Sequence, residues 1–173
     1  DDLDYGLAID RYLGFVASLG IVPWSSFHAF TRSQAVDRQE YLELLRNLNL
    51  YMQRQKIPEI DPTVQSDQWL ASERQFLEQA GDIMTRRWAI QPIVRLCNLQ
   101  HVKNYVPMKL EFLDMTEETE MFRRASGLGM FVFWKQRFFL HDQPLTREDV
   151  ALWIFGLPAV QREFKEWQRM DFE

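Results

Sequence analysis

The sequence has a single cysteine, Cys97, and only seven glycines and seven prolines among 173 residues. A lone thiol excludes an intramolecular disulfide and favours a reducing compartment such as the cytoplasm or an organelle matrix. So few turn-forming residues argue against a β fold with many tight turns, and the abundant Leu, Gln, Arg and Glu favour helix. The composition therefore predicts an all-α protein.

Long hydrophobic runs are also missing. No apolar run approaches the roughly 20 residues that span a bilayer. The run GLGMFVFW at residues 127–134, for example, ends after eight. We therefore expect a soluble protein without a transmembrane segment. The chain begins with Asp1 rather than Met, which suggests a processed form or a piece of a longer chain.

Sequence signatures of catalysis are absent as well. The chain has no H-E-x-x-H, Glu-x-x-His, G-x-S-x-G or S-x-x-K motif and no nucleotide-binding glycine loop. Cys97 and His101 have the spacing of two ligands on one helix face, but no other Cys or His lies nearby. No catalytic residue, metal site or cofactor is therefore predicted, and the protein is expected to be non-catalytic.

What the sequence does have is helical periodicity along most of its length. It predicts helices over 4–19, 33–55, 67–90, 116–140, 146–155 and 158–169, and a shorter helix after Pro92 that ends at about 104. Ser33 or Asp37, Ser66 and Thr146 are the expected N-caps, and Pro92 is expected to stop or kink a helix. Residues 106–114 are the one stretch that could be extended. The prediction is a single domain over 1–173, an irregular bundle of about seven helices without an internal repeat.

The helix expected over about 116–140 is the unusual one. Apolar side chains of 122–140 go almost all the way round a helical wheel, so this helix would be central in the bundle or shared with another chain. Insertion into a membrane surface is disfavoured because Arg123, Arg124, Lys135 and Arg137 are spread round the wheel. The sequence therefore predicts a bundle packed around a central aromatic-rich helix.

Charge is unevenly distributed along the chain. Segment 83–110 has five Lys and Arg and segment 121–141 has four, and neither contains an acid, although the whole chain carries a net charge of −5. If the two segments were neighbours, they would form a positive face for an acidic protein or for phosphate. Alternatively, acidic neighbours neutralise them, as Glu120 could do for Arg123 and Arg124.

These observations predict a non-catalytic helical protein-interaction module, such as an accessory or structural subunit of a larger complex or a homo-oligomer. The residues expected to bind the partner are Arg123, Arg124, Phe131, Trp134, Lys135, Arg137 and Phe138. One alternative is a nucleic-acid-binding domain using segments 83–110 and 121–141, with contacts from Arg86, Arg87, Arg95 and Lys103. Another is a helical protein that holds an apolar ligand or cofactor.

Overall fold

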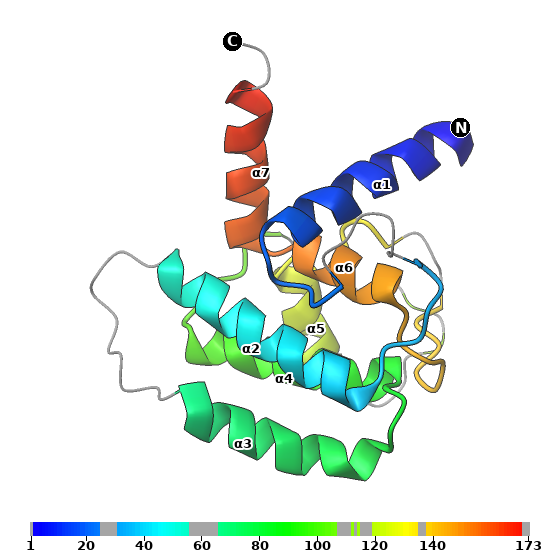
Figure 1. Ribbon diagram of the computed structural model, residues 1–173, viewed down its shortest axis with the longest axis vertical. Helices are drawn as coiled ribbons and strands as arrows, with labels where there is room; N and C mark the ends of the chain where they lie inside the picture. The colour runs from blue at the N-terminus through cyan, green and yellow to red at the C-terminus, as the bar shows by residue number, and fades with distance from the viewer. Residues whose placement is uncertain are drawn as a thin grey trace.

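The computed structural model describes residues 2–24, 31–55, 66–106, 112, 114, 119–134 and 138–170. Within these residues the chain forms seven α-helices and no strand (Figure 1). In chain order the helices are α1 (Asp2–Ser18), α2 (Arg38–Arg54), α3 (Ser66–Leu77), α4 (Arg86–Leu99), α5 (Thr119–Gly127), α6 (Arg147–Phe155) and α7 (Pro158–Met170). The predicted all-α fold is confirmed.

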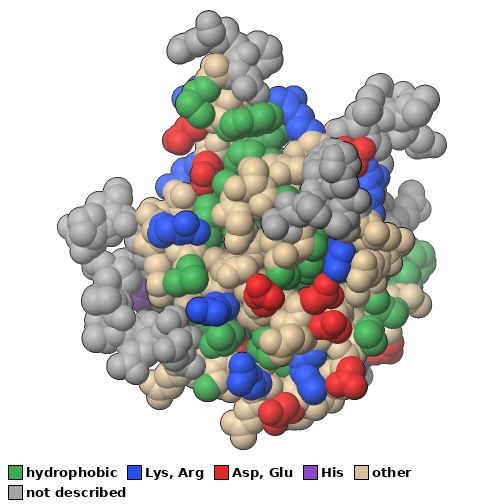
Figure 2. Space-filling view, in the orientation of Figure 1, with side chains coloured by type: hydrophobic (Ala, Val, Ile, Leu, Met, Phe, Trp, Pro, Cys, Tyr) green, Lys and Arg blue, Asp and Glu red, His purple; other side chains and the backbone are tan. Residues whose placement is uncertain are grey.

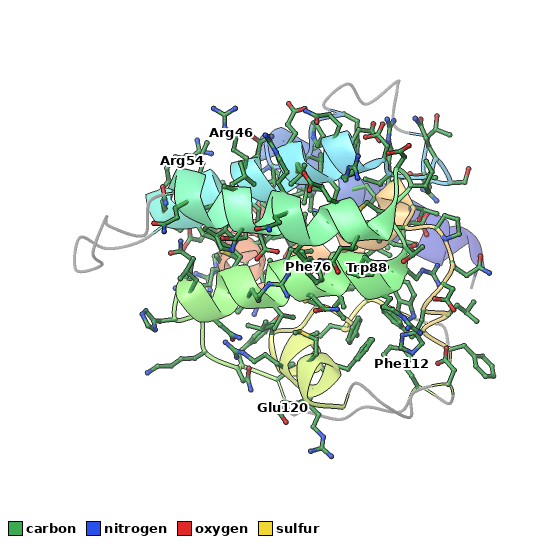
Figure 3. The ribbon with its side chains drawn as sticks, turned by 90° about the horizontal axis from the view of Figure 1, so that it is seen from below. Arg46, Arg54, Phe76, Trp88, Phe112 and Glu120 are labelled. Atoms are coloured by element: carbon green, nitrogen blue, oxygen red, sulfur yellow. The ribbon has the colours of Figure 1, made fainter. Side chains whose placement is uncertain are left out.

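The helices pack as two connected groups. Helix α2 contacts α3 and α4, and α4 also contacts α5, while α6 contacts α1 and α7. Figure 1 shows α1 and α7 rising from one side of the molecule and diverging, with α3 on the opposite side. Phe76 of α3 and Trp88 of α4 face each other where these helices pack (Figure 3), with ring centroids 5.0 Å apart.

Helices α2, α4 and α6 begin side by side because a ring of backbone hydrogen bonds joins the segments that precede them. The Val36 N–H donates to the Leu145 carbonyl (2.8 Å), Leu145 to Met84 (2.8 Å) and Met84 back to Val36 (3.0 Å). The three segments read VDR, MTR and LTR at residues 36–38, 84–86 and 145–147. In each segment the arginine is the first residue of its helix.

Two of these arginines each form an ion pair with an acid in the first turn of another of the three helices. Arg86 at the start of α4 pairs with Asp149 of α6 at 3.0 Å, and Arg147 at the start of α6 pairs with Glu40 of α2 at 2.5 Å. Asp149 and Glu40 also complete capping boxes on their own helices. A carboxylate in the first helical turn interacts favourably with the helix dipole, so each acid serves both its own helix and the neighbour's arginine.

The predicted helix over 67–90 is wrong. Helix α3 ends at Leu77, and a single 3-10 turn leads to Gly81, whose φ of 83° is costly for other residues. The next helix, α4, then continues through Pro92 instead of stopping there and ends at Leu99. Because Pro92 is buried together with neighbours such as Ile90 and Ile93, packing compensates for the hydrogen bond that its missing N–H cannot make.

The predicted helix over 116–140 is also wrong in its second half, because α5 ends at Gly127. The Met130 N–H donates to the Ala125 carbonyl (3.1 Å) and the Gly129 N–H to the Ser126 carbonyl (2.9 Å). With Gly129 at a φ of 87°, these two bonds form a Schellman motif, which ends a helix. Residues 128–133 then form turns and residues 138–140 are not helical, so the predicted central helix is in fact a short helix followed by a loop.

Four other predicted helices are confirmed with small changes at their ends. They correspond to α1, α2, α6 and α7, and Asp37 and Thr146 are N-caps as expected. The extended stretch expected over 106–114 lies mostly outside the described residues.

Candidate functional site

Aromatic rings from α5, from the loop after it, from α6 and from position 112 pack against one another. We call this group the aromatic cluster, and its members are Phe112, Phe122, Phe131, Trp134, Phe139 and Trp153. Phe139 stacks on Trp153 at 5.9 Å between ring centroids, and Phe122 meets Phe139 edge-on at 4.7 Å. Phe122, Phe139 and Trp153 are fully buried. The loop therefore completes the hydrophobic core, as the sequence predicted for this segment, although it is not helical.

A buried ion pair adjoins the aromatic cluster. The Arg86 guanidinium donates from Nε and Nη2 to the two carboxylate oxygens of Asp149, and from Nη1 to the Phe139 carbonyl. It also lies over the Trp134 ring, 4.7 Å from the centroid. Removing one partner of such a pair would leave a buried charge uncompensated, so Arg86 and Asp149 hold this part of the fold together.

Asp114 binds the C-terminal part of the loop, at residues 139 and 140. Its carboxylate accepts hydrogen bonds from the backbone N–H groups of Phe139 (2.8 Å) and Leu140 (2.7 Å). Burial by itself would raise the pKa of Asp114, but these two donors, together with nearby His141, hold the pKa below its usual value. The carboxylate is therefore charged at neutral pH and holds residues 139 and 140 in place.

Three apolar side chains of the same loop point outward. Val132, Phe138 and Leu140 are 53%, 47% and 43% exposed, and we call them the apolar patch. At residues 138–140 exposed and buried side chains alternate: Phe139 of the aromatic cluster is fully buried, whereas Phe138 and Leu140 on either side of it are exposed. The exposed side chains of the patch are thus next in sequence to residues that pack in the aromatic cluster.

The residues predicted to bind a partner have several different environments. Phe131 and Trp134 belong to the aromatic cluster and are partly buried, whereas Phe138 lies in the apolar patch and Arg123 is exposed. Lys135 and Arg137 lie outside the described residues. The structure thus separates a predicted single surface into supporting residues and exposed ones.

Arg124, another of those residues, is bound within the chain. It donates from Nε to the Asn98 side chain (2.7 Å), and also contacts the Asn104 side chain and the Val102 carbonyl. Arg124 therefore fixes the segment that follows α4, and its expected pairing with Glu120 is not among the ion pairs of the described residues.

Most of the residues proposed for nucleic-acid contact are also paired internally. Arg87 lies 3.7 Å from Asp142, and Arg95 forms two hydrogen bonds with Glu73, the shorter at 2.6 Å. Arg86 is buried and paired with Asp149. Of the four residues proposed for nucleic-acid contact, only Lys103 is therefore without a carboxylate partner among the described residues. The internal acids thus neutralise much of the basic segment 83–110.

Lys103 lines a pocket between the end of α2, the segment after α4 and the first two turns of α7. We call it the α2–α7 pocket; its volume is about 470 Å³. Its apolar lining comes from Met52, Val102, Leu157, Pro158 and Ala159, and its polar lining from Gln55, Gln100, Lys103, Asn104, Tyr105, Gln161, Arg162 and Lys165. Sequence analysis did not find this site, because its residues come from three segments far apart in the chain and share no motif.

Close backbone contacts fix the wall of this pocket. A Cβ on Gly156 would lie 2.0 Å from the Gly129 carbonyl oxygen, so the two glycines allow the turn before α7 to meet the end of α5. Tyr105 packs over Gly129 and donates its hydroxyl to the Gly156 carbonyl, and its own N–H donates to the Gly127 carbonyl at 3.0 Å. Together with Arg124, these contacts make the wall a fixed part of the fold.

The described residues contain no group of three or more His, Cys, Asp or Glu side chains placed to hold a metal ion. Cys97 and His101 do not share a helix face, because Cys97 is buried in α4 whereas His101 lies beyond its end with a φ of 52°. Burial raises the pKa of the Cys97 thiol to about 12. A buried, protonated thiol is a poor nucleophile.

Among the described helices, none has the length and apolar character needed to cross a membrane. Comparison of the chain with protein families, with curated proteins and with solved structures finds no match.

Proposed function

We propose that this protein is a non-catalytic helical module that binds another protein through the apolar patch, as an accessory or structural subunit of a complex. The observation that carries the proposal is the alternation within one loop, where buried Phe139 separates exposed Phe138 and Leu140. Exposed large apolar side chains held next to a packed core are typical of the core of a protein interface.

Charge favours a different protein over a second copy of this one as the partner. The segment that carries the patch, 121–141, contains four Lys and Arg and no acid. A symmetric dimer would place each patch against itself and bring like charges together, which costs binding energy. Asp114, the described carboxylate bound to this loop, is already occupied by two backbone donors. A partner with acidic residues around an apolar surface complements this charge best.

Photocrosslinking tests this proposal. Phe138 is replaced by benzoylphenylalanine, a photoreactive amino acid of similar shape, and the full chain is irradiated in extracts of the cells that produce it. Leu50 of α2, which is 41% exposed, receives the same replacement as a matched control. We expect position 138 to crosslink one acidic protein in stoichiometric amount and position 50 to crosslink none.

A second variant makes the crosslink specific to the patch. Val132→Asp places a carboxylate on the patch and should abolish the crosslink from position 138, whereas Leu50→Asp should leave it unchanged. A crosslink to a second copy of this chain, to nucleic acid, or to the same proteins from positions 138 and 50 would overturn the proposal. If position 138 forms no crosslink in extracts that contain the total protein of the cell, the proposal is overturned as well.

A further inference from the structure

Three positively charged side chains, from two segments of the chain, line the α2–α7 pocket. Lys103 lies on the segment after α4, and Arg162 and Lys165 lie on α7. No Asp or Glu lines this pocket, and among the described residues none of the three cations forms an ion pair. Figure 2 shows basic side chains around the end of α2 and the base of α7. Charges of one sign in a concave site attract an oppositely charged ligand.

Helix α7 adds to this positive potential because its N-terminal turn, with Pro158 and Ala159, lines the pocket. Pro158 has no N–H and the Gln161 N–H donates to the Leu157 carbonyl (2.9 Å), so the contribution of this turn is mainly the positive end of the helix dipole. Glu163 of α7 accepts hydrogen bonds from Tyr51 (2.7 Å) and from Gln55 (3.0 Å), which lines the pocket. Glu163 is thereby engaged in tying α7 to α2.

The pocket also has an apolar side and the size of a small-molecule site. Val102, Pro158 and Ala159 are partly exposed and provide apolar surface. The side-chain amides of Gln55 and Gln161 also line the pocket, while donating to Glu163 and to the Phe155 carbonyl. A volume of about 470 Å³ falls within the range of about 300–1,000 Å³ that is usual for ligand sites. The wall formed by residues 102–105 is held by Arg124 and by the glycine contacts, so the pocket is preformed.

We propose that the α2–α7 pocket binds a small organic anion. The phosphate or carboxylate group of this ligand contacts Lys103, Arg162 and Lys165, and its apolar body lies against Val102, Pro158 and Ala159. This site is separate from the apolar patch, because no residue of the patch lines the pocket, so either proposal can fail while the other holds.

Binding of three naphthalene probes to the full chain tests the proposal. The probes are 2-naphthyl phosphate, 2-naphthoate and neutral 2-naphthol, and their fluorescence and calorimetric titration give the affinity. We expect the phosphate or the carboxylate to bind at least about tenfold more tightly than naphthol, and the order of the two anions identifies the acid group that the site prefers. Equal affinity for all three probes would overturn the proposal, as would no binding at millimolar concentration.

Charge reversals locate the bound anion. Arg162→Glu and Lys165→Glu should each weaken binding of the preferred anion by about tenfold and leave binding of naphthol within about twofold. The matched control is Arg46→Glu, because Arg46 lies on α2 and points away from the pocket (Figure 3). Circular dichroism verifies that each variant is folded. Equal weakening by Arg46→Glu and Lys165→Glu would mean attraction to the overall charge of the molecule and would contradict a specific site.

Discussion

At the scale of single residues, burial controls the chemistry of Cys97. Its side chain is fully buried, and burial raises the pKa of the thiol to about 12. An exposed cysteine has a pKa of about 8.5, so at pH 8 far less of Cys97 is present as thiolate. We expect iodoacetamide to alkylate Cys97 in the folded protein at least about a thousandfold more slowly than in urea. Mass spectrometry of samples taken over time measures both rates, and equal rates would contradict the burial of this thiol.

Asp114 links the stability of the loop to pH. Its pKa is lowered in the folded protein, so its contribution is fully present above the ordinary carboxyl pKa of about 3.9 and is lost as the pH falls through the lower folded value. Asp114→Asn should therefore reduce the free energy of unfolding by about 1 kcal/mol at pH 7 and by a smaller amount at pH 2.5, which is below the ordinary carboxyl pKa. Urea unfolding of both proteins at each pH measures this difference. A constant difference at both pH values would mean that the carboxylate charge has no part in holding the loop.

Arg123 and Arg124 are adjacent in sequence and have opposite roles in the structure. Arg124 makes hydrogen bonds to the segment after α4, whereas Arg123 is exposed. Arg124→Met should lower the free energy of unfolding by about 1–3 kcal/mol and weaken binding of the naphthalene anion, because the pocket wall loses its support. Arg123→Met should change stability by less than about 0.5 kcal/mol. If the two variants behaved alike in urea unfolding, the role assigned to Arg124 would be wrong.

At the scale of the elements, the turn between α6 and α7 depends on a backbone contact. Gly156 has an ordinary helical φ of −68°, but a Cβ there would meet the Gly129 carbonyl oxygen. Gly156→Ala should therefore cost about 2–4 kcal/mol. Gly20→Ala is the matched control, because Gly20 has a φ of 69° and free space around it, so its cost is conformational and about 1–2 kcal/mol. Thermal and urea unfolding compare the two, and a smaller cost at Gly156 would contradict the close approach.

The elements that the sequence predicted well are those with local signals. Asp37 and Thr146 are N-caps followed by an acid at the third helical position, and each begins a helix as expected. The end of α5 also has a local signal, because Gly129 is the kind of residue that takes the left-handed position after a helix. The apolar pattern of 128–140 outweighed it in the prediction, since aromatic residues suit a buried helix and a buried loop equally well.

Other features could not be found from local signals. The ring that joins the starts of α2, α4 and α6 depends on hydrogen bonds between residues more than forty positions apart, such as Val36 and Leu145. Asp149, the partner of Arg86, is also far away in the sequence. The number of charged residues in segment 83–110 therefore could not show that Arg86 is buried in the core instead of exposed on the surface. The α2–α7 pocket depends on the same long-range arrangement, because three distant segments supply its walls.

At the scale of the whole molecule, the structure presents two surfaces of different chemistry. The apolar patch lies on the loop after α5, and the basic α2–α7 pocket lies at the turn before α7. Both are supported by the end of α5: Gly129 begins the loop and also contacts Gly156 beside the pocket. We therefore expect variants that loosen the end of α5 to affect both surfaces, whereas Val132→Asp and Lys165→Glu should each affect one.

Comparison of Phe138 with Phe139 tests the central claim most directly, which is that adjacent side chains of one loop serve the core and the surface. We predict that Phe139→Ala lowers the free energy of unfolding by about 3–5 kcal/mol, as for a fully buried phenylalanine, and that Phe138→Ala lowers it by less than about 1 kcal/mol. Leu replaces Ala at both positions if Phe139→Ala does not fold. Similar losses at the two positions in urea unfolding, or a larger loss at Phe138, would contradict the account.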